Sequence, residues 1–118
     1  AKILLVDDAA FMRMMVKNAL TKSGYDNFVE AQDGGEAVKK YDEENPDMVI
    51  MYITMPNMDG LQALKKIKES HPAAKIVMCT AMGQESMVVD AIKSGAKDFI
   101  VKPFNQERIV ETVKTILG

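Results

Sequence analysis

The sequence predicts an α/β fold in which one parallel β-sheet is covered by helices on both faces. Two observations indicate this architecture. Short apolar runs alternate with helical patterns along the whole chain of 118 residues, and most positions within a run are apolar, as in parallel strands that are buried on both sides. Five strands and five helices in strict alternation imply right-handed crossovers within a single domain, residues 1–118.

The first apolar run, Lys2–Val6, predicts a buried strand. A helix is expected over Ala10–Lys22, where apolar residues recur three and four positions apart. Gly24 is expected to end this helix because glycine readily adopts a left-handed conformation. Asn27–Ala31 is the second expected strand, and Asp33 is then suited to cap the next helix or to form a turn.

The second helix is expected over Glu36–Glu44 and ends at Asn45-Pro46, since proline removes a backbone donor. The third strand, Asp47–Met51, is the most continuously apolar of the five. A polar loop follows, and the third helix is expected over Leu61–Glu69. His71-Pro72 is expected to end this helix, because the residue before a proline is disfavoured in the helical conformation.

Lys75–Cys79 is the fourth expected strand, and a helix over Gln84–Lys93 follows it. Gly95 is expected to end this helix. The inward-facing residues of this fourth helix are expected to be Met87, Val88, Ala91 and Ile92. The fifth strand is expected over Lys97–Val101, and an apolar stripe predicts the last helix over Glu107–Leu117.

Composition and charge are those of an ordinary globular domain. Hydrophobic residues make up 47% of the chain and charged residues 27%, and 15 basic against 17 acidic residues give a net charge of -2. A charge of this size does not recruit nucleic acid or anionic membranes. No apolar stretch approaches the length of a membrane span, and no signal peptide is recognisable. We therefore expect a monomer with neither nucleic acid nor membrane as a partner.

Cys79 is the single cysteine and lies inside an apolar run. One cysteine excludes a disulfide framework, which fits a reducing, cytoplasmic location. A nucleophilic thiol would need a base, and the only histidine, His71, lies in a loop-like segment. Since buried cysteine behaves as a small hydrophobe, we expect Cys79 to be inert strand core.

Polar side chains follow the carboxyl ends of the predicted strands. Asp7 and Asp8 follow the first strand, Thr80 follows the fourth, and Lys102 follows the fifth. Ligands of open parallel sheets bind outside these ends, so the side chains are expected to share one cleft. Adjacent carboxylates fit a hard cation such as Mg2+, and an ammonium group and a hydroxyl suit phosphoryl oxygens. The alternative is that one aspartate caps the next helix and the other is simply solvated.

The third strand runs into Tyr52, at a position where this cleft would be expected to hold another carboxylate. A phenol is neutral at pH 7, because its pKa is about 10. Loss of a charged contact predicts weaker binding of the cation, by about 1–3 kcal/mol. The bulky ring must project into the cleft or displace the adjoining loops.

Four motifs resemble those of two-component receiver domains. They are Asp7-Asp8, the loop Met55-Pro56-Asn57-Met58-Asp59-Gly60, Thr80-Ala81 and Lys102-Pro103-Phe104. The resemblance covers the whole chain and leaves no output domain. It is greatest for the stand-alone chemotaxis regulators, and the segments 9–15 and 79–83 are similar to versions from thermophilic bacteria. It implies a flavodoxin-like (βα)5 three-layer sandwich with strand order 2-1-3-4-5.

The resemblance also implies which residues hold the cation. By position, Asp8 matches the direct Mg2+ ligand, and Asp7 matches the aspartate that acts largely through water. Thr54 falls where the family supplies a backbone carbonyl to the metal.

Other matches concern the phosphoryl group and the switch that responds to it. Thr80 matches the switch hydroxyl, and Lys102 matches the lysine that pairs with the phosphoryl group. Phe99 occupies the position of the switch aromatic residue. Pro103 resembles a proline that often follows a cis peptide bond.

Tyr52 departs from the family pattern, because that position is the aspartate that accepts a phosphoryl group from a histidine kinase. Met51 and Ile53 are inert neighbours, and Thr54 is a poor acceptor without a base. We therefore expect Tyr52 to abolish phosphorylation or to mimic it. Three origins fit the sequence: an engineered substitution, a natural loss, or a chemically modified side chain.

The leading interpretation is a signalling receiver rather than an enzyme. It would relay a histidine-kinase signal to the flagellar motor switch protein through the fourth helix, the fifth strand and the fifth helix. The first alternative is a phosphorylation-independent interaction module on the same fold. The second is a small hydrolase or phosphotransferase, which is disfavoured because no general base lies at the strand ends.

Overall fold

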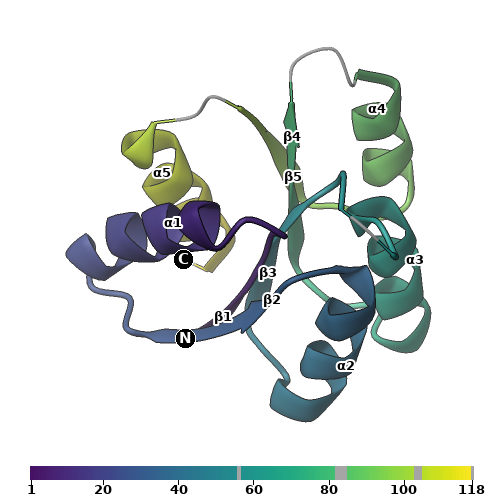
Figure 1. Cartoon of the computed structure of the whole chain (residues 1–118), viewed down its shortest axis with the longest axis horizontal. Coiled ribbons are helices and arrows are strands. Elements are labelled where there is room, and N and C mark those ends of the chain that lie inside the picture. Colours follow the sequence, from purple (N-terminus) through teal and green to yellow (C-terminus); the bar gives the residue numbers. More distant parts are fainter. Residues whose placement is uncertain (56, 82–84, 103–104, 118) are drawn as a thin grey trace.

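In a computed structural model, which describes residues 1–55, 57–81, 85–102 and 105–117, strands and helices alternate strictly along the chain (Figure 1). The strands are β1 (Lys2–Val6), β2 (Asn27–Ala31), β3 (Met48–Tyr52), β4 (Ile76–Ala81) and β5 (Asp98–Lys102). The helices are α1 (Ala10–Lys22), α2 (Gly34–Glu44), α3 (Gly60–Ser70), α4 (Glu85–Lys93) and α5 (Gln106–Leu117). All strand pairs are parallel, in the order β2-β1-β3-β4-β5. The predicted fold and strand order are confirmed.

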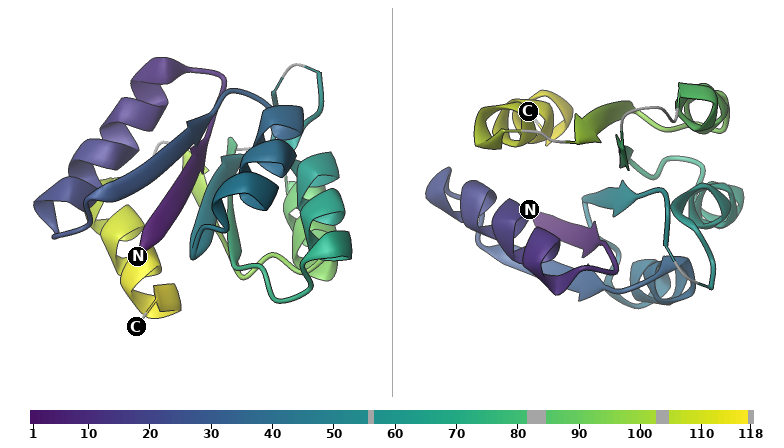
Figure 2. Two further views of the ribbon diagram at one scale, coloured as in Figure 1. Left: turned by 90° about the horizontal axis from the view of Figure 1, so that it is seen from below. Right: turned by 45° about the horizontal axis from the view of Figure 1, so that its top comes forward.

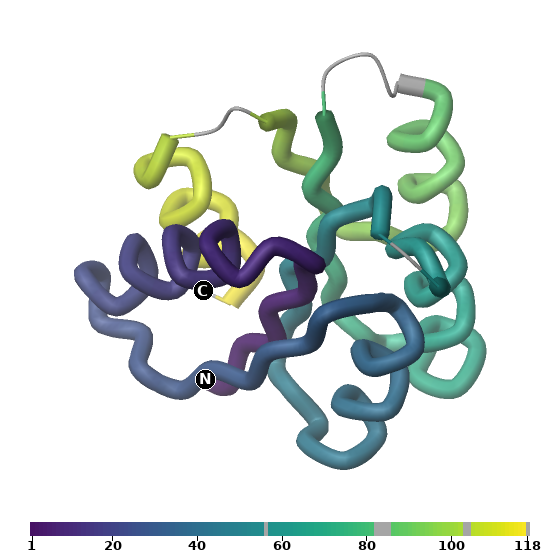
Figure 3. Tube along the Cα trace, in the orientation of Figure 1, coloured from purple at the N-terminus to yellow at the C-terminus, as the bar shows by residue number. Residues whose placement is uncertain are grey.

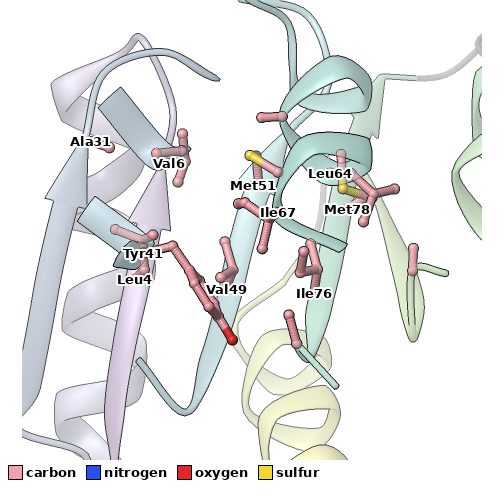
Figure 4. Packing of buried hydrophobic residues seen from close by; sticks show 14 of the residues in the cluster. Leu4, Val6, Ala31, Tyr41, Val49, Met51, Leu64, Ile67, Ile76 and Met78 are labelled. Atoms are coloured by element: carbon pink, nitrogen blue, oxygen red, sulfur yellow. The ribbon is translucent and has the colours of Figure 1, made fainter. Parts of the chain in front are cut away.

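The helices form two layers around the sheet. Helices α1 and α5 cover one face, and α2, α3 and α4 cover the other (Figures 1 and 2). Figure 3 shows the chain passing from each strand to the next through one helix. Successive side chains of a strand point to opposite faces, so the three interior strands β1, β3 and β4 contribute to the cores on both faces. The core between the sheet and α2–α4 contains, among others, Leu4, Val6, Val49, Met51, Ile76 and Met78 (Figure 4).

Three strands extend further than the apolar pattern predicts. Tyr52 still pairs with Cys79, and Ala81 still pairs with Lys102, so β3, β4 and β5 include these polar or small residues. Ladder hydrogen bonds are made by the backbone, so pairing continues where the side chains stop being apolar.

The loop between β3 and α3 is held tightly by backbone contacts to two glycines. The N–H of Gly60 donates to the carbonyl of Ile53 at 2.6 Å, and the N–H of Gly34 donates to the carbonyl of Met58 at 2.8 Å. A Cβ atom at Gly60 would lie 2.2 Å from the carbonyl oxygen of Tyr52. The chain can therefore turn directly after Tyr52 only because residue 60 has no side chain.

Several local predictions can be compared with the structure. Asp33 caps α2, since its Oδ1 accepts from the N–H of Glu36 at 2.8 Å. Gly24 and Gly95 have positive φ angles of 98° and 107°, as predicted for helix ends. The inward placement of Ile92 was wrong, because its side chain is 44% exposed. The predicted inward placement of Ala91 is confirmed, and Met87 packs against the same core.

None of the helices in the described ranges combines the length and hydrophobicity needed to cross a bilayer.

Candidate functional site

The register of the sheet brings the strand ends to one edge. Val6 pairs with Met51, and Tyr52 pairs with Cys79, so Asp7 and Tyr52 follow at the same level of neighbouring strands. Ala81 pairs with Lys102 two residues further along. Because side chains alternate between faces, Tyr52 and Lys102 share the face covered by α1 and α5.

A cation, an anion and an aromatic ring meet at this edge, and we call Asp7, Tyr52 and Lys102 the lysine cluster. The ammonium nitrogen of Lys102 lies 3.1 Å from Oδ2 of Asp7 and 3.7 Å from the centroid of the Tyr52 ring. The side chains of Lys102 and Asp7 are only 20% and 11% exposed. An ammonium group over a ring face is attracted by the ring quadrupole. The cluster therefore holds Lys102 by one ion pair and one cation–π contact.

Four polar contacts hold the side chain and backbone of Asp7. Its Oδ1 accepts from the N–H of Ala9 at 3.0 Å, while Oδ2 faces Lys102. Its backbone N–H donates to the carbonyl of Ala31 at 3.2 Å, and its own carbonyl accepts from Nη1 of Arg13 at 2.5 Å. Such a carboxylate has a defined orientation.

Asp8 directly follows Asp7 in the chain, Thr54 comes two residues after Tyr52, and both are exposed. Within the described ranges, no three acidic, histidine or cysteine side chains lie close enough to form a metal site. Two adjacent carboxylates are nevertheless hard oxygen donors, and each carboxylate has about four lone-pair positions. Mg2+ usually binds through one or two carboxylates and keeps several waters. Asp7 and Asp8 are therefore the residues whose chemistry suits such an ion.

The ring of Tyr52 is half-buried and packs against both hydrophobic cores. Together with Met12, Arg13, Val16 and Cys79 it lines a cavity of about 20 Å³ between the sheet and α1. A cavity this small holds about one water molecule. The ring and its neighbours therefore leave little free space between the end of β3 and helix α1.

Thr80 and Phe99 lie on the other face of the sheet. Thr80 is buried, and its hydroxyl donates to the carbonyl of Ala81 at 3.2 Å. Phe99 is 36% exposed on the edge strand β5. Pro103, with its expected cis peptide bond, lies outside the described residues. Of the predicted site residues, Asp7, Tyr52 and Lys102 meet by direct contact. Asp8, Thr54 and Thr80 lie at or just after the carboxyl ends of β1, β3 and β4, and Phe99 lies near the start of β5.

Cys79 pairs with Tyr52 on the neighbouring strand β4 and is buried. Burial raises the pKa of its thiol to about 12, with Lys102 opposing the shift and Asp7 adding to it. A thiol that stays protonated is a poor nucleophile. The predicted place of Cys79 in the strand core is confirmed, and the raised pKa agrees with an unreactive thiol.

Two features were missed by sequence reasoning. Arg13 contacts Asp7, and the available signal was a single arginine within an otherwise apolar stretch of α1. The second concerns α4 and β5, part of the predicted output surface: several large apolar residues are exposed there, and we call them the α4–β5 patch. Its exposed residues are Val89, Ile92, Phe99 and Val101.

The chain is similar to known proteins over nearly its whole length. Residues 3–114 match the model of the response regulator receiver domain. The chain is 58% identical over 117 residues to the chemotaxis protein CheY of Bacillus subtilis (strain 168), covering 99% of this chain and 98% of that protein. It is 56% identical over 115 residues to the chemotaxis protein CheY of Thermotoga maritima, covering 98% and 96%.

Solved structures of receiver domains and of CheY are also similar to this chain over nearly its whole length. One similar chain belongs to the CheX-CheY-BeF3-Mg+2 complex from Borrelia burgdorferi, with 37% identity, a TM-score of 0.93, and coverage of 99% of this chain and 89% of that chain. The receiver domain of NtrX from Brucella abortus has 33% identity and a TM-score of 0.91, with coverage of 98% and 97%.

Proposed function

Because the chain belongs to the family of response regulator receiver domains and resembles CheY, we propose that it is a chemotaxis switch whose phosphate step is blocked at Tyr52. In this proposal Tyr52 occupies the position of the phosphate-accepting aspartate. The observation that carries it is the contact of Lys102 with both Asp7 and the Tyr52 ring. Lys102, which would pair with a phosphoryl group, already contacts Asp7 and the ring, and Tyr52 offers no carboxylate to accept that group.

The proposal assigns Mg2+ to the acidic pair. Asp8 would bind it directly, Asp7 largely through water, and Thr54 through its backbone carbonyl. When bound, the ion supplies positive charge that neutralises phosphoryl oxygens. Asp7 keeps its orientation through Ala9. With Tyr52 contributing no charge, we expect weak binding.

The remaining assignments concern signal input and output. A histidine kinase would be the phosphate donor, Thr80 and Phe99 the switch residues, and the flagellar motor switch protein the target. The α4–β5 patch supports a protein partner, because exposed apolar residues that cluster mark interaction surfaces. We place this monomeric regulator in the cytoplasm, where such a relay operates.

Phosphorylation with acetyl phosphate and Mg2+ tests the central claim. The intact mass of the protein should stay unchanged, whereas the Tyr52→Asp variant should gain one phosphoryl group. Labelling of the unaltered chain would refute the block. A Tyr52→Asp variant that stays inert would show that the rest of the site does not support phosphorylation.

The second candidate function is an interaction module that works without phosphorylation. It is favoured by the α4–β5 patch, which is exposed in a chain whose site lacks an acceptor carboxylate. A peptide from a flagellar motor switch protein distinguishes the two functions. Equal binding to this chain and to phosphorylated Tyr52→Asp favours the module or a mimic of the active state. Binding as weak as that of unphosphorylated Tyr52→Asp favours a blocked switch.

A further inference from the structure

Arg13 on helix α1 connects three elements near the acidic pair. Its Nη1 donates to the carbonyl of Asp7 at 2.5 Å, and its Nε donates to Oε1 of Glu30 on β2 at 3.0 Å. The Arg13 side chain is only 11% exposed. A planar guanidinium group can make both contacts in one fixed orientation.

The contact with Asp7 occurs where the sheet stops supporting β1. Strand β1 ends at Val6, and the N–H of Asp7 makes one more bond, to Ala31 of β2. The Asp7 carbonyl begins the peptide unit that leads to Asp8. Arg13 supplies the donor for this carbonyl, and it thereby fixes the plane of the Asp7–Asp8 peptide.

Glu30 balances the charge of Arg13. A bare guanidinium group beside two aspartates would repel an incoming cation, but Glu30 lies within ion-pair distance of it. Lys17, one turn further along α1, also approaches Glu30, at 3.9 Å. The Arg13–Glu30 pair can therefore orient the acidic pair while adding no net charge to the site.

We infer that Arg13 is a positioning residue for the cation site, acting through the backbone of Asp7. This inference rests on the proposed Mg2+ site and deepens it. Groups that orient metal ligands from behind typically change metal affinity by about 10–100-fold when removed. Because Mg2+ bound by one or two carboxylates usually keeps several waters, we expect about a tenfold loss, at the lower end of that range.

A role of Arg13 through its charge and a role through positioning predict opposite changes in Mg2+ affinity. If Arg13 acted only through its charge, Arg13→Gln would remove a repulsive cation, and Mg2+ would bind more tightly. If Arg13 positions the acidic pair, the same variant binds Mg2+ more weakly. Lys17→Gln is the matched control, since it removes the same charge from the same helix and the same Glu30 without touching Asp7.

The experiment is a Mg2+ titration of the whole chain followed by the amide NMR signals of Asp8 and Ala9, with thermal unfolding recorded for each variant. We expect about tenfold weaker binding for Arg13→Gln and less than a twofold change for Lys17→Gln. Arg13→Lys should fall between the two, because an ammonium group cannot reach both the Asp7 carbonyl and Glu30 with the same fork geometry. Unchanged or tighter binding in Arg13→Gln overturns the inference.

A second readout needs no metal. Ala9 donates its N–H to Asp7, so loosening of Asp7 should speed hydrogen exchange at Ala9 in Arg13→Gln and not in Lys17→Gln. If the unaltered chain binds no Mg2+, the proposed metal site fails, and exchange at Ala9 decides the role of Arg13 alone. Exchange as slow as in the unaltered chain overturns it. If Arg13→Gln does not fold, Arg13→Lys is compared by the same two measurements.

Discussion

Residue 52 determines what Lys102 can do. A carboxylate at this position would attract the ammonium group as an ion, whereas the phenol ring offers its face, 3.7 Å from Nζ. The lysine remains partly buried because Asp7 still supplies the opposite charge. The lysine cluster is thus stable without a phosphoryl group, and its two contacts can be separated by mutation.

A double-mutant cycle between Tyr52 and Lys102 should measure the cation–π contact. We expect Tyr52→Leu and Lys102→Met to show a coupling of about 0.5–1 kcal/mol in the free energy of unfolding. Tyr52→Phe is the control, since it keeps the ring face and should keep most of the coupling. Urea denaturation provides the measurement. The contact is contradicted if the Tyr52→Leu cycle shows no coupling free energy. It is also contradicted if Tyr52→Phe retains no more of the coupling with Lys102 than Tyr52→Leu does.

Cys79 predicts a specific loss of stability at alkaline pH. Its pKa in the folded state is raised to about 12, while an unfolded thiol ionises at about 8.5. Above the unfolded pKa the unfolded state has lost a proton that the folded state keeps, so stability falls by about 1.4 kcal/mol per pH unit. Below it the contribution is fully present. Denaturant unfolding between pH 8 and 10 should show a steeper decline for this chain than for Cys79→Ala; parallel curves would show that the thiol ionises normally.

At the scale of elements, two adjacent glycines of α2 have different roles. A Cβ atom on Gly34 would lie 2.4 Å from the carbonyl oxygen of Met58, whereas one on Gly35 would meet its nearest neighbour, Oδ1 of Asp33, at 3.5 Å. Gly34 therefore belongs to the contact between α2 and the loop after β3. Gly35 only contributes flexibility to the unfolded chain.

Alanine at each glycine gives a matched pair. Gly34→Ala should lower the free energy of unfolding by about 1–3 kcal/mol, because backbone atoms must move. Gly35→Ala should raise it by up to about 1 kcal/mol, since the position is exposed and helical. Urea unfolding of both variants is the measurement. Equal effects of the two substitutions would mean that the close approach to Met58 is not sterically limiting.

Local patterns predicted the elements well, because burial on both sides leaves a continuous apolar signal in β1 and β3. They failed where contacts are not encoded by hydrophobicity. Lys102 and Ala81 belong to strands through backbone pairing, and Ile92 satisfies the helical spacing of α4 but faces solvent. The acidic pair and Lys102 could be found from strand ends alone. Arg13 could not, since its role depends on the distance between α1 and the last carbonyl after β1.

At the scale of the whole molecule, the sheet separates the lysine cluster from the β5 residues of the α4–β5 patch. The lysine cluster lies toward α1 and α5, while Thr80 lies on the opposite face, together with Phe99 and Val101 of the α4–β5 patch. Thr80 pairs with Val101 and Met78 with Phe99, so the end of β4 is joined directly to the exposed edge strand. A signal from residue 52 to this patch would therefore pass across β4 into β5. With Tyr52 in place, the proposed input is absent, whereas the α4–β5 patch is still exposed.

This arrangement predicts that the α4–β5 patch does not respond to phosphate donors in this chain. Addition of acetyl phosphate and Mg2+ should leave the amide NMR signals of Phe99 and Val101 unchanged, because no acceptor carboxylate is present and Lys102 stays with Asp7 and the ring. The same addition to Tyr52→Asp should shift both signals, as an aspartyl phosphate would draw Lys102 and Thr80 toward it and move β5. Tyr52→Phe serves as the control, since it alters the side chain without creating an acceptor and should stay silent. Shifts in the unaltered chain would mean that the patch senses the donor by a route other than residue 52.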